Sequence, residues 1–263
     1  MCLILFAHQT HPDYPLVLAA NRDEAYARPT APATFWNDNP CIYAGRDLEQ
    51  GGTWLGITRA GAIAAVTNFR ASAGAMNSSR SRGALVASYL NADQRPANYL
   101  AQVRTDMDAY NGFNLIAGNI GELRYISNCG GQPAIIEPGV HGLSNHLLDT
   151  PWPKVERGRN ILTELLQSKA QDLTDGLFNL LAERAIAPDD ALPESGVGRE
   201  RERVLSPAFI VSPGYGTRSS TVILVDNHGQ VTFIERSFGE HGNPGSSTTG
   251  RFALDIAPSP AVA

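Results

Sequence analysis

The fold is decided near the start of the chain, by the sequence MCLILFAH at positions 1–8 and LVLAANRDE at positions 16–24. Both stretches begin mainly apolar, and the turn between them contains Pro12, Asp13 and Pro15. Two short apolar segments joined by a polar turn predict a β-hairpin. The start of the first strand in such a hairpin lies beside the end of the second. Residue 2 is therefore expected near the polar residues that close the second segment.

Similar hairpins are predicted further along the chain, over residues 53–68, 113–127 and 221–236. Between them, Leu, Val and Tyr recur every three or four residues, which is the period of a half-buried helix. These helical stretches are residues 81–91, 97–107, 155–166 and 173–185. Hairpins interrupted by pairs of helices predict an α+β fold, in which antiparallel sheets carry helical layers on their outer faces.

The chain has 263 residues and is 43% hydrophobic, which is enough to build a substantial core. We expect residues 1–239 to form a single domain. Residues 186–203 contain prolines, glycines and an alternating run of Arg and Glu, which predicts a solvated loop. Residues 240–263 are rich in Gly, Ser, Thr and Pro, which predicts a flexible C-terminal tail.

Charge and apolar patterning argue against several classes of protein. The formal net charge of -5 gives no basic face for the phosphates of a nucleic acid. The longest apolar runs are shorter than the roughly 20 residues that cross a bilayer, so no transmembrane segment is predicted. The N-terminus also has no basic leader of the kind found in secretory signals. We therefore expect a cytoplasmic protein with a small-molecule ligand or substrate, and no pattern indicates its oligomeric state.

Cysteine and histidine spacing gives no indication of a metal site. The three cysteines, Cys2, Cys41 and Cys129, are far apart and form no CxxC pair, which also disfavours a disulfide framework. The six histidines include no HExxH motif. We expect reduced thiols and no bound metal.

Cys2 is the candidate nucleophile. Methionine is normally removed when the next residue is small, which would give Cys2 a free α-amino group beside its thiol. An α-amine has an ordinary pKa of about 7.7 to 8 and a thiol one of about 8.5, so the amine can act as the base for the thiol. The structural alternative is that Cys2 is an ordinary apolar residue of the first strand.

The polar motif Asn21-Arg22-Asp23-Glu24 favours the catalytic interpretation, because it is expected at the end of the sheet beside Cys2. The Asp23 carboxylate could orient the α-amine. The Arg22 guanidinium could lower the pKa of the thiol or hold an anionic group of the substrate. The alternative is that the motif forms an exposed turn before a helix.

Five ordered motifs together resemble the NRDE family, which is also called the transport and Golgi organisation protein 2 family. They are Cys2, the Asn21-Arg22-Asp23-Glu24 segment, GGTWLG at 51–56, TNFR at 67–70 and GLSN at 142–145. The resemblance extends from residue 2 to about residue 226. It implies a fold of the N-terminal-nucleophile hydrolase type, which is a four-layer αββα sandwich of two mainly antiparallel sheets.

The same landmarks are similar, more distantly, to cholylglycine hydrolase and penicillin V acylase. That resemblance implies that Asp23 steadies the α-amine and that Asn68 helps to form the oxyanion hole. It also implies that Asn145 completes the polar groups around the reacting carbonyl. A side-chain amide is suited to this task, because it can donate a hydrogen bond to a developing oxyanion.

The chain departs from the hydrolase pattern at its arginine. Those hydrolases have an arginine three residues before the aspartate, where this chain has Ala20, and Arg22 instead lies next to Asp23. Thiol activation and substrate contacts are therefore expected to differ. Arg218 lies in roughly the region where those hydrolases carry another functional arginine. The candidates for substrate binding are Asn21, Arg22, Trp54 and Arg218.

The predicted function is hydrolysis of a small non-peptide amide by an N-terminal cysteine, which requires no cofactor. One alternative, suggested by relatives in the resembled family, is that the chain binds or traffics haem on the same scaffold. The chain has no CxxCH motif, and no axial ligand is predicted. A further alternative, suggested by the family name, is a non-catalytic scaffold for membrane-traffic proteins.

Overall fold

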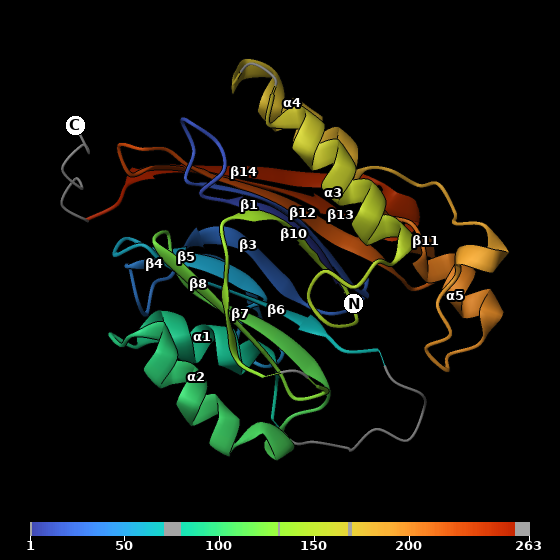
Figure 1. Ribbon diagram of the computed structural model, residues 1–263, viewed down its shortest axis with the longest axis horizontal. Helices are drawn as coiled ribbons and strands as arrows, with labels where there is room; N and C mark the ends of the chain where they lie inside the picture. The colour runs from blue at the N-terminus through green and yellow to red at the C-terminus, as the bar shows by residue number, and fades with distance from the viewer. Residues whose placement is uncertain (1, 71–79, 131, 168–169, 256–263) are drawn as a thin grey trace.

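Two antiparallel β-sheets stack face to face in the computed structural model, which describes residues 2–70, 80–130, 132–167 and 170–255 (Figure 1). The first sheet contains, in spatial order, β10 (Gly139–Leu143), β1 (Cys2–His8), β2 (Leu16–Ala25), β12 (Tyr215–Val225), β13 (Gln230–Phe238) and β14 (Pro244–Ala253), with β11 (Val211–Ser212) paired to β12. The second sheet contains β3 (Thr30–Phe35), β4 (Ile42–Asp47), β5 (Leu55–Thr58), β6 (Ala62–Asn68), β7 (Phe113–Asn119), β8 (Glu122–Ser127) and β9 (Ala134–Ile136).

Pairs of helices cover the outer faces of the two sheets (Figure 1). The helices are α1 (Gly83–Asn91) and α2 (Pro96–Thr105) on the second sheet, α3 (Pro153–Leu165) and α4 (Ala170–Leu181) on the first, and α5 (Arg199–Leu205). Short 3-10 helices are η1 (Met107–Ala109), η2 (Asp189–Ala191) and η3 (Glu240–Gly242). The predicted α+β fold with four layers in the order αββα is confirmed.

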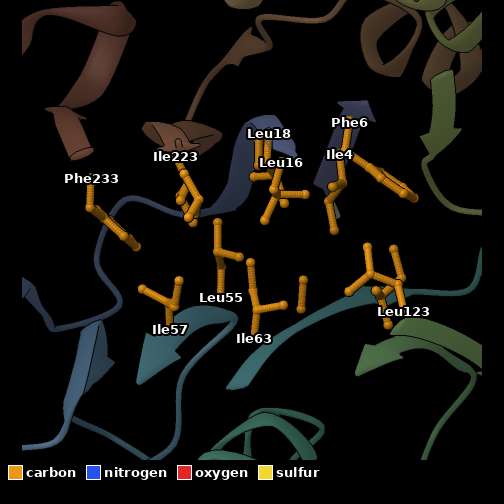
Figure 2. Close-up of a cluster of buried hydrophobic side chains, with 14 of the residues drawn as sticks. Ile4, Phe6, Leu16, Leu18, Leu55, Ile57, Ile63, Leu123, Ile223 and Phe233 are labelled. Carbon is orange, nitrogen blue, oxygen red and sulfur yellow. The ribbon is translucent and has the colours of Figure 1, made fainter. Parts of the chain in front are cut away.

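The strand period of two divides the side chains of β1 between two apolar layers. Ile4 and Phe6 point toward the second sheet, whereas Leu3 and Leu5 point toward α3 and α4. Figure 2 shows the cluster between the sheets, in which Ile4 and Phe6 lie opposite Leu123. Burial of these side chains from water holds the layers together.

The register of the first hairpin brings Cys2 beside the polar motif. Cys2 lies directly opposite Arg22 in the pairing of β1 with β2. Opposed residues in an antiparallel pair share a face of the sheet, so Cys2 and Arg22 lie on the same side as Ile4, toward the second sheet. Asn21 and Asp23 therefore face the helical layer. The motif is part of β2 and does not form an exposed turn.

Strand β14 corrects the prediction of a flexible tail over residues 240–263. Within the described part of that segment, β14 is hydrogen-bonded to β13 along its length. Phe252 is buried, and its ring lies 5.1 Å from that of Phe35 across the sandwich. A strand rich in Ser, Thr and Gly shows no apolar alternation, so the sequence pattern missed it. Residues 256–263 lie outside the described residues.

Helix α5 corrects the prediction of a solvated loop over residues 186–203. Its charges alternate in sequence, but Glu202 is only 3% exposed. The Glu202 carboxylate accepts a charge-assisted hydrogen bond from Arg70, which is equally buried. The end of the predicted loop is therefore an ordered element that covers the region around Arg70.

Candidate functional site

A polar cavity of about 310 Å³ lies where β1 begins. Its walls come from both sheets and from the start of α1. The candidate residues from the sequence that line it are Cys2, Arg22, Asp23, Trp54 and Asn68. Lining residues that the sequence did not single out include Arg28, Asp47 and Arg82. Residues that are far apart in the sequence thus meet at one end of the sandwich.

Cys2 is a partly exposed residue of the cavity wall. Burial of the thiol raises its pKa, and the neighbouring Asp23 carboxylate raises the pKa further. The backbone N–H of Asp23 and the Arg22 guanidinium act in the opposite direction, because both stabilise the thiolate. Since the net shift is upward, Cys2 carries its proton at neutral pH and needs a base in order to react as a nucleophile.

Arg22 is held beside Cys2 by three neighbours. The carbon of its guanidinium lies 4.3 Å from the Trp54 ring centroid, and Nη1 donates to Thr30 Oγ1 at 3.2 Å. Nη2 lies 3.8 Å from Glu24 Oε2. Burial lowers the pKa of Arg22 and Glu24 raises it, but an arginine remains a cation. Trp54 therefore serves as the stacking surface for this cation.

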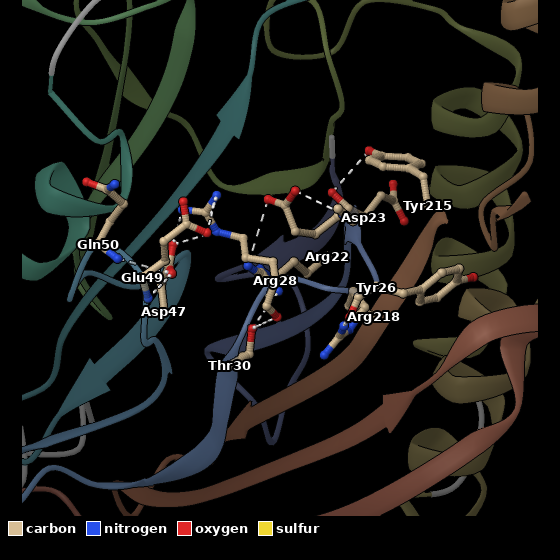
Figure 3. Close-up of polar contacts among 12 residues, drawn as sticks. Arg22, Asp23, Tyr26, Arg28, Thr30, Asp47, Glu49, Gln50, Tyr215 and Arg218 are labelled. Carbon is tan, nitrogen blue, oxygen red and sulfur yellow. Dashed lines mark hydrogen bonds and ion pairs between the residues drawn. The ribbon is translucent and has the colours of Figure 1, made fainter. Parts of the chain in front are cut away.

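Asp23 is only 1% exposed and is fixed through both its side chain and its backbone. Oδ1 accepts a hydrogen bond from Thr217 Oγ1 at 2.8 Å. The backbone carbonyl oxygen accepts one from the Tyr215 hydroxyl at 3.1 Å, as Figure 3 shows. Burial raises the pKa of Asp23 above its usual value, and the ammonium of Lys154 offsets only part of that rise. A rigidly held acid thus lies next to the Cys2–Arg22 pair.

A second charged pair lies further along the cavity wall (Figure 3). Arg28 Nε and Nη2 donate to Asp47 Oδ2 at 2.9 and 2.7 Å. Arg28 Nη1 lies 3.5 Å from Glu49 Oε2. Burial alone would raise the pKa of Asp47, but the hydrogen bonds from Arg28 hold it below its usual value. The cavity therefore presents fixed charges of both signs to a small polar ligand.

Asn68 and Asn145 have different positions in the site. Asn68, at the end of β6, lines the cavity. Asn145 is fully buried outside the cavity lining, and its Nδ2 donates to the Asn68 backbone carbonyl at 2.9 Å. The neighbouring Ser144 Oγ donates to the backbone carbonyl of Cys2 at 3.1 Å. The Ser144-Asn145 segment therefore fastens β1 and β6 together, and the structure places Asn145 behind Asn68 and outside the cavity lining.

Two predicted substrate-binding residues lie outside the cavity lining. Asn21 Nδ2 donates to the backbone carbonyls of Leu181 and Ala208, both at 2.8 Å, because the strand alternation turns it toward the helical layer. Arg218 lies at a bulge of β12 and donates to the backbone carbonyl of Tyr26 (Figure 3). In the structure both side chains donate hydrogen bonds to backbone carbonyls of neighbouring segments.

Charged residues beneath the cavity were not identified from the sequence. Lys154 of α3 is buried, and its charge acts on Asp23 and Cys2. Arg70 pairs with Glu202, and its backbone N–H donates to the carbonyl of Asn145 at 2.7 Å. Arg70 is the last residue of the TNFR motif, but the sequence analysis predicted no role for it. No motif marks Lys154.

A second cavity of about 630 Å³ adjoins the first. The two share Glu24, Asn68 and Arg82 in their linings. The rest of the second lining is more apolar and includes Phe69 and Leu205. Asn68 therefore lies at the boundary between a polar space beside Cys2 and a larger, less polar one.

Two glycines explain how Trp54 reaches this site. Gly51 has φ +74°, a left-handed conformation that favours glycine. A Cβ on Gly52 would lie 2.5 Å from the carbonyl carbon of Gly83 at the start of α1. The backbone N–H of Thr53 donates to the Gly83 carbonyl at 3.2 Å. The loop therefore passes close to the start of α1, and Trp54, which follows it, lies in the cavity wall.

The described ranges contain neither a metal-binding cluster nor a helix that could cross a membrane. Within them, no three His, Cys, Asp or Glu side chains are grouped so as to hold a metal ion. No helix in the same part of the chain has the length and apolar character needed to cross a membrane. Cys2, Cys41 and Cys129 are free thiols in the structure.

Comparison with known proteins identifies similar chains over nearly the full length. The family model described as Transport and Golgi organisation 2 matches residues 1–240. The chain is 40% identical over 277 residues to the Transport and Golgi organization protein 2 homolog of Bos taurus, with 97% of this chain and 99% of the relative covered. It is 41% identical over 258 residues to the Homo sapiens homolog, with 90% and 93% covered.

Solved structures also include a similar chain. A mutant conjugated bile acid hydrolase from Clostridium perfringens matches with a TM-score of 0.47 and 8% sequence identity. The match covers 98% of this chain and 99% of the hydrolase.

Proposed function

The chain belongs to the Transport and Golgi organisation 2 family, and we propose that it hydrolyses a small non-peptide amide with Cys2 as an N-terminal nucleophile. The observation that carries the proposal is the position of Cys2 in the wall of a polar cavity, directly opposite Arg22 and beside the buried carboxylate of Asp23. A thiol, a fixed carboxylate and a side-chain amide at one cavity are the groups that acyl transfer to cysteine needs.

The first half of the reaction forms a thioester. Removal of Met1 gives Cys2 a free α-amine, which Asp23 orients. The amine accepts the thiol proton as Sγ attacks the carbonyl carbon of the amide, and a tetrahedral oxyanion forms. The side-chain amide of Asn68 donates a hydrogen bond to this oxyanion. The α-ammonium then gives its proton to the amide nitrogen as the C–N bond breaks, and the product amine leaves.

The second half restores the enzyme. Water attacks the carbonyl carbon of the thioester, and the α-amine again accepts a proton. The C–S bond breaks, the carboxylic acid leaves, and Cys2 regains its thiol proton. Arg22 stabilises the thiolate in both halves of the reaction. Asn145 holds Asn68 in place by donating a hydrogen bond to the backbone carbonyl of Asn68.

The test is release of amine from a panel of small N-acyl amides by protein whose mass confirms the loss of Met1. Cys2→Ala is expected to abolish the release, because it removes the nucleophile. Cys41→Ser is the matched control, since Cys41 is exposed and does not line the cavity. Release that persists in Cys2→Ala, or the lack of release from every amide by the native chain, would contradict the proposal.

Haem carriage is the alternative, and the cavity residues fit it poorly. The described residues that line the two cavities include one thiol, that of Cys2, one phenol, that of Tyr215, and no histidine. Haem iron is bound by histidine, methionine, a tyrosinate or a cysteine thiolate. Burial raises the pKa of both the Cys2 thiol and the Tyr215 hydroxyl and so favours their neutral forms. A Soret band on haem titration that disappears in Cys2→Ala would support carriage over hydrolysis.

A non-catalytic scaffold for membrane traffic is the further alternative, and it is suggested by the names of the relatives. Such a role would depend on surfaces of the protein and not on a thiol in a cavity. Restoration of the cellular function by Cys2→Ala as fully as by the native chain would favour the scaffold.

A further inference from the structure

Arg82 lines both cavities and forms no ion pair within the described part of the chain. Its Nη1 donates a hydrogen bond to the backbone carbonyl of Gly112 at 3.1 Å. The other arginines of the polar cavity each lie close to a carboxylate: Arg22 is 3.8 Å from Glu24, Arg28 is 2.7 Å from Asp47, and Arg80 is 2.9 Å from Asp106. Arg82 is thus a cation of the cavity wall whose charge no described carboxylate matches.

The guanidinium of Arg82 is half-buried and keeps one edge for a ligand. The Gly112 carbonyl occupies Nη1, which leaves Nε and Nη2, and this edge suits paired hydrogen bonds to the two oxygens of a carboxylate. The Glu24 carboxylate, which also lines both cavities, has other contacts. Its Oε1 accepts the backbone N–H of Ala25 at 2.9 Å, and its Oε2 faces Arg22. The free edge of Arg82 therefore favours an anionic ligand at the boundary between the cavities.

The position of Cys2 decides which part of an amide lies in which cavity. Cys2 lines the first cavity and is absent from the lining of the second. In the proposed reaction the acyl group becomes bonded to Sγ, so it occupies the first cavity during both halves. That cavity has a volume of about 310 Å³ and a mainly charged lining. A short, polar acyl group fits such a space, whereas a long hydrocarbon chain would leave the charged groups without water.

The second cavity suits an apolar group on the amide nitrogen. Its volume of about 630 Å³ is within the ordinary range for small-molecule sites. Phe69 and Pro213 line it, and α5 contributes Arg201, Val204 and Leu205. Val204 is 42% exposed although it is apolar, and Arg201 is exposed, so water screens its charge. A ligand that covered Val204 would remove apolar surface from water.

We propose that the substrate is the half-amide of a short dicarboxylic acid and that Arg82 binds its free carboxylate. This inference rests on the proposed function and names the substrate class. The scissile carbonyl lies at Cys2 and Asn68, the acyl part lies in the polar cavity, and the apolar group on nitrogen extends into the second cavity. Hydrolysis consumes one water and releases the dicarboxylic acid and an amine. The pairing with Arg82 holds the acyl part in place until water attacks the thioester.

The first test needs no turnover and compares iodoacetate with iodoacetamide as alkylating agents of Cys2. The two reagents have similar shapes, but only iodoacetate carries a carboxylate. The ratio of their rate constants cancels changes in the pKa of the thiol, because both react with the same thiolate. In the Cys41→Ser, Cys129→Ser background, Arg82→Met is expected to lower the iodoacetate-to-iodoacetamide ratio by roughly fivefold or more.

Arg104→Met is the matched control for this ratio, because Arg104 is exposed on α2 and lines neither cavity. It should change the ratio by less than about twofold, since salt screens a distant charge. A ratio that is the same in Arg82→Met as in the native background would overturn the proposal.

The second test measures hexylamine release from N-hexylsuccinamic acid and from its neutral carboxamide analogue, N-hexylsuccinamide. The native chain is expected to prefer the acid in kcat/KM by roughly tenfold or more, because the charged hydrogen bonds are lost with the amide. Arg82→Met should reduce the preference to less than about twofold, and Arg82→Lys should keep part of it. The preference is a ratio within each variant, so it does not depend on how much of the variant is folded.

The orientation of the substrate is tested with N-octanoylglycine, which carries its carboxylate on the amine side of the scissile bond. Faster hydrolysis of N-octanoylglycine than of N-hexylsuccinamic acid would overturn the proposal. An equal preference for charged and neutral amides in the native chain would overturn it as well.

These readouts separate the inference from the proposed function. An alkylation ratio that depends on Arg82, without hydrolysis of any amide, would remove the hydrolase and keep Arg82 as a carboxylate-binding residue beside Cys2. Hydrolysis that requires Cys2 but is indifferent to the charge at Arg82 would keep the hydrolase and remove the inferred substrate class.

Discussion

Cys2 lies directly opposite Arg22 in the antiparallel pairing of β1 with β2. This relationship places the second residue of the chain at the middle of the polar motif, and both side chains face the second sheet. Asp23 follows Arg22 and faces the helical layer. The candidate nucleophile therefore has a cation on one side of the sheet and a carboxylate on the other, and each can be altered separately.

Replacement of Arg22 should make Cys2 harder to ionise. The guanidinium lowers the pKa of the thiol, so Arg22→Met is expected to raise the pH midpoint of alkylation. Arg22→Lys keeps the charge but loses the planar stack on Trp54, and a smaller rise is expected. The measurement is the alkylation rate of Cys2 against pH. An unchanged midpoint in Arg22→Met would contradict the assigned role.

The two asparagines should differ in their effects on stability. Asn145→Ala removes the donor to the Asn68 carbonyl and is expected to lower the free energy of unfolding by about 1 to 3 kcal/mol. Asn68→Ala keeps that carbonyl, because it belongs to the backbone, and should cost much less stability while reducing hydrolysis. Urea unfolding of both variants checks the difference. Equal losses of stability would argue against the supporting role of Asn145.

His141 should stabilise the fold mainly at acidic pH. Its Nδ1 lies 2.7 Å from Asp149 Oδ2, and Asp149 Oδ1 accepts the backbone N–H of Gly142 at 2.8 Å. Burial lowers the pKa of His141, but the bonds to Asp149 and the Glu137 carbonyl outweigh it, and the net shift is upward. A histidine whose pKa is raised by folding adds stability that is complete below its unfolded pKa, about 6.5, and is lost as pH rises through the folded pKa.

Thermal unfolding checks this pH dependence. The native chain should exceed His141→Gln in Tm by more at about pH 5.5 than at about pH 8.5. His228→Gln is the control, because His228 lies exposed in the turn between β12 and β13. A difference between the native chain and His141→Gln that stays constant over this range would contradict the assignment.

Strand β14 should be part of the core, and Phe252 tests this. Its ring is 8% exposed and lies 5.1 Å from Phe35 and 5.5 Å from Tyr43. Phe252→Ala is expected to lower the free energy of unfolding by about 3 kcal/mol or more. Arg251→Ala, at the exposed neighbouring position, should change it by less than about 0.5 kcal/mol. Similar small losses in both variants would favour the flexible tail predicted from the sequence.

The layers of the fold could be predicted because their signals are local. The apolar run of β1, the turn and the second apolar run define a hairpin within 25 residues, and the pairs of helices show a clear period. Strands β3 and β9 were not predicted, because they lack such local signals. Strand β3 contains Pro32 and three exposed or half-buried small residues, and β9 has only three residues.

The candidate site was predictable only in part. The motifs indicated Cys2, Asp23 and Asn68, because these residue types suit acyl transfer and lie at strand ends. Whether a polar strand residue faces the cavity or the helical layer depends on the register of the strand pairing. In this register Arg22 faces the cavity, whereas Asn21 faces the helical layer. Register is a matter of tertiary pairing, and a short polar motif does not determine it.

Buried charges were the hardest feature to foresee. Glu202 lies in a run of alternating charges that predicts solvent exposure, yet the tertiary contact with Arg70 buries it. Lys154 follows Pro153 at the start of an ordinary helical pattern, and nothing in the local sequence indicates that its ammonium is buried. Such buried charges become visible only when distant elements are brought together.

The most direct test of the account is the intact mass of the Cys41→Ser, Cys129→Ser double variant before and after brief treatment with iodoacetamide. This variant keeps Cys2 as its single thiol, because the chain has three cysteines. The account predicts a mass that lacks Met1 and the gain of one label on Cys2. Retained Met1, or a Cys2 that stays unlabelled in the folded protein, would contradict the claim that Cys2 is an N-terminal nucleophile.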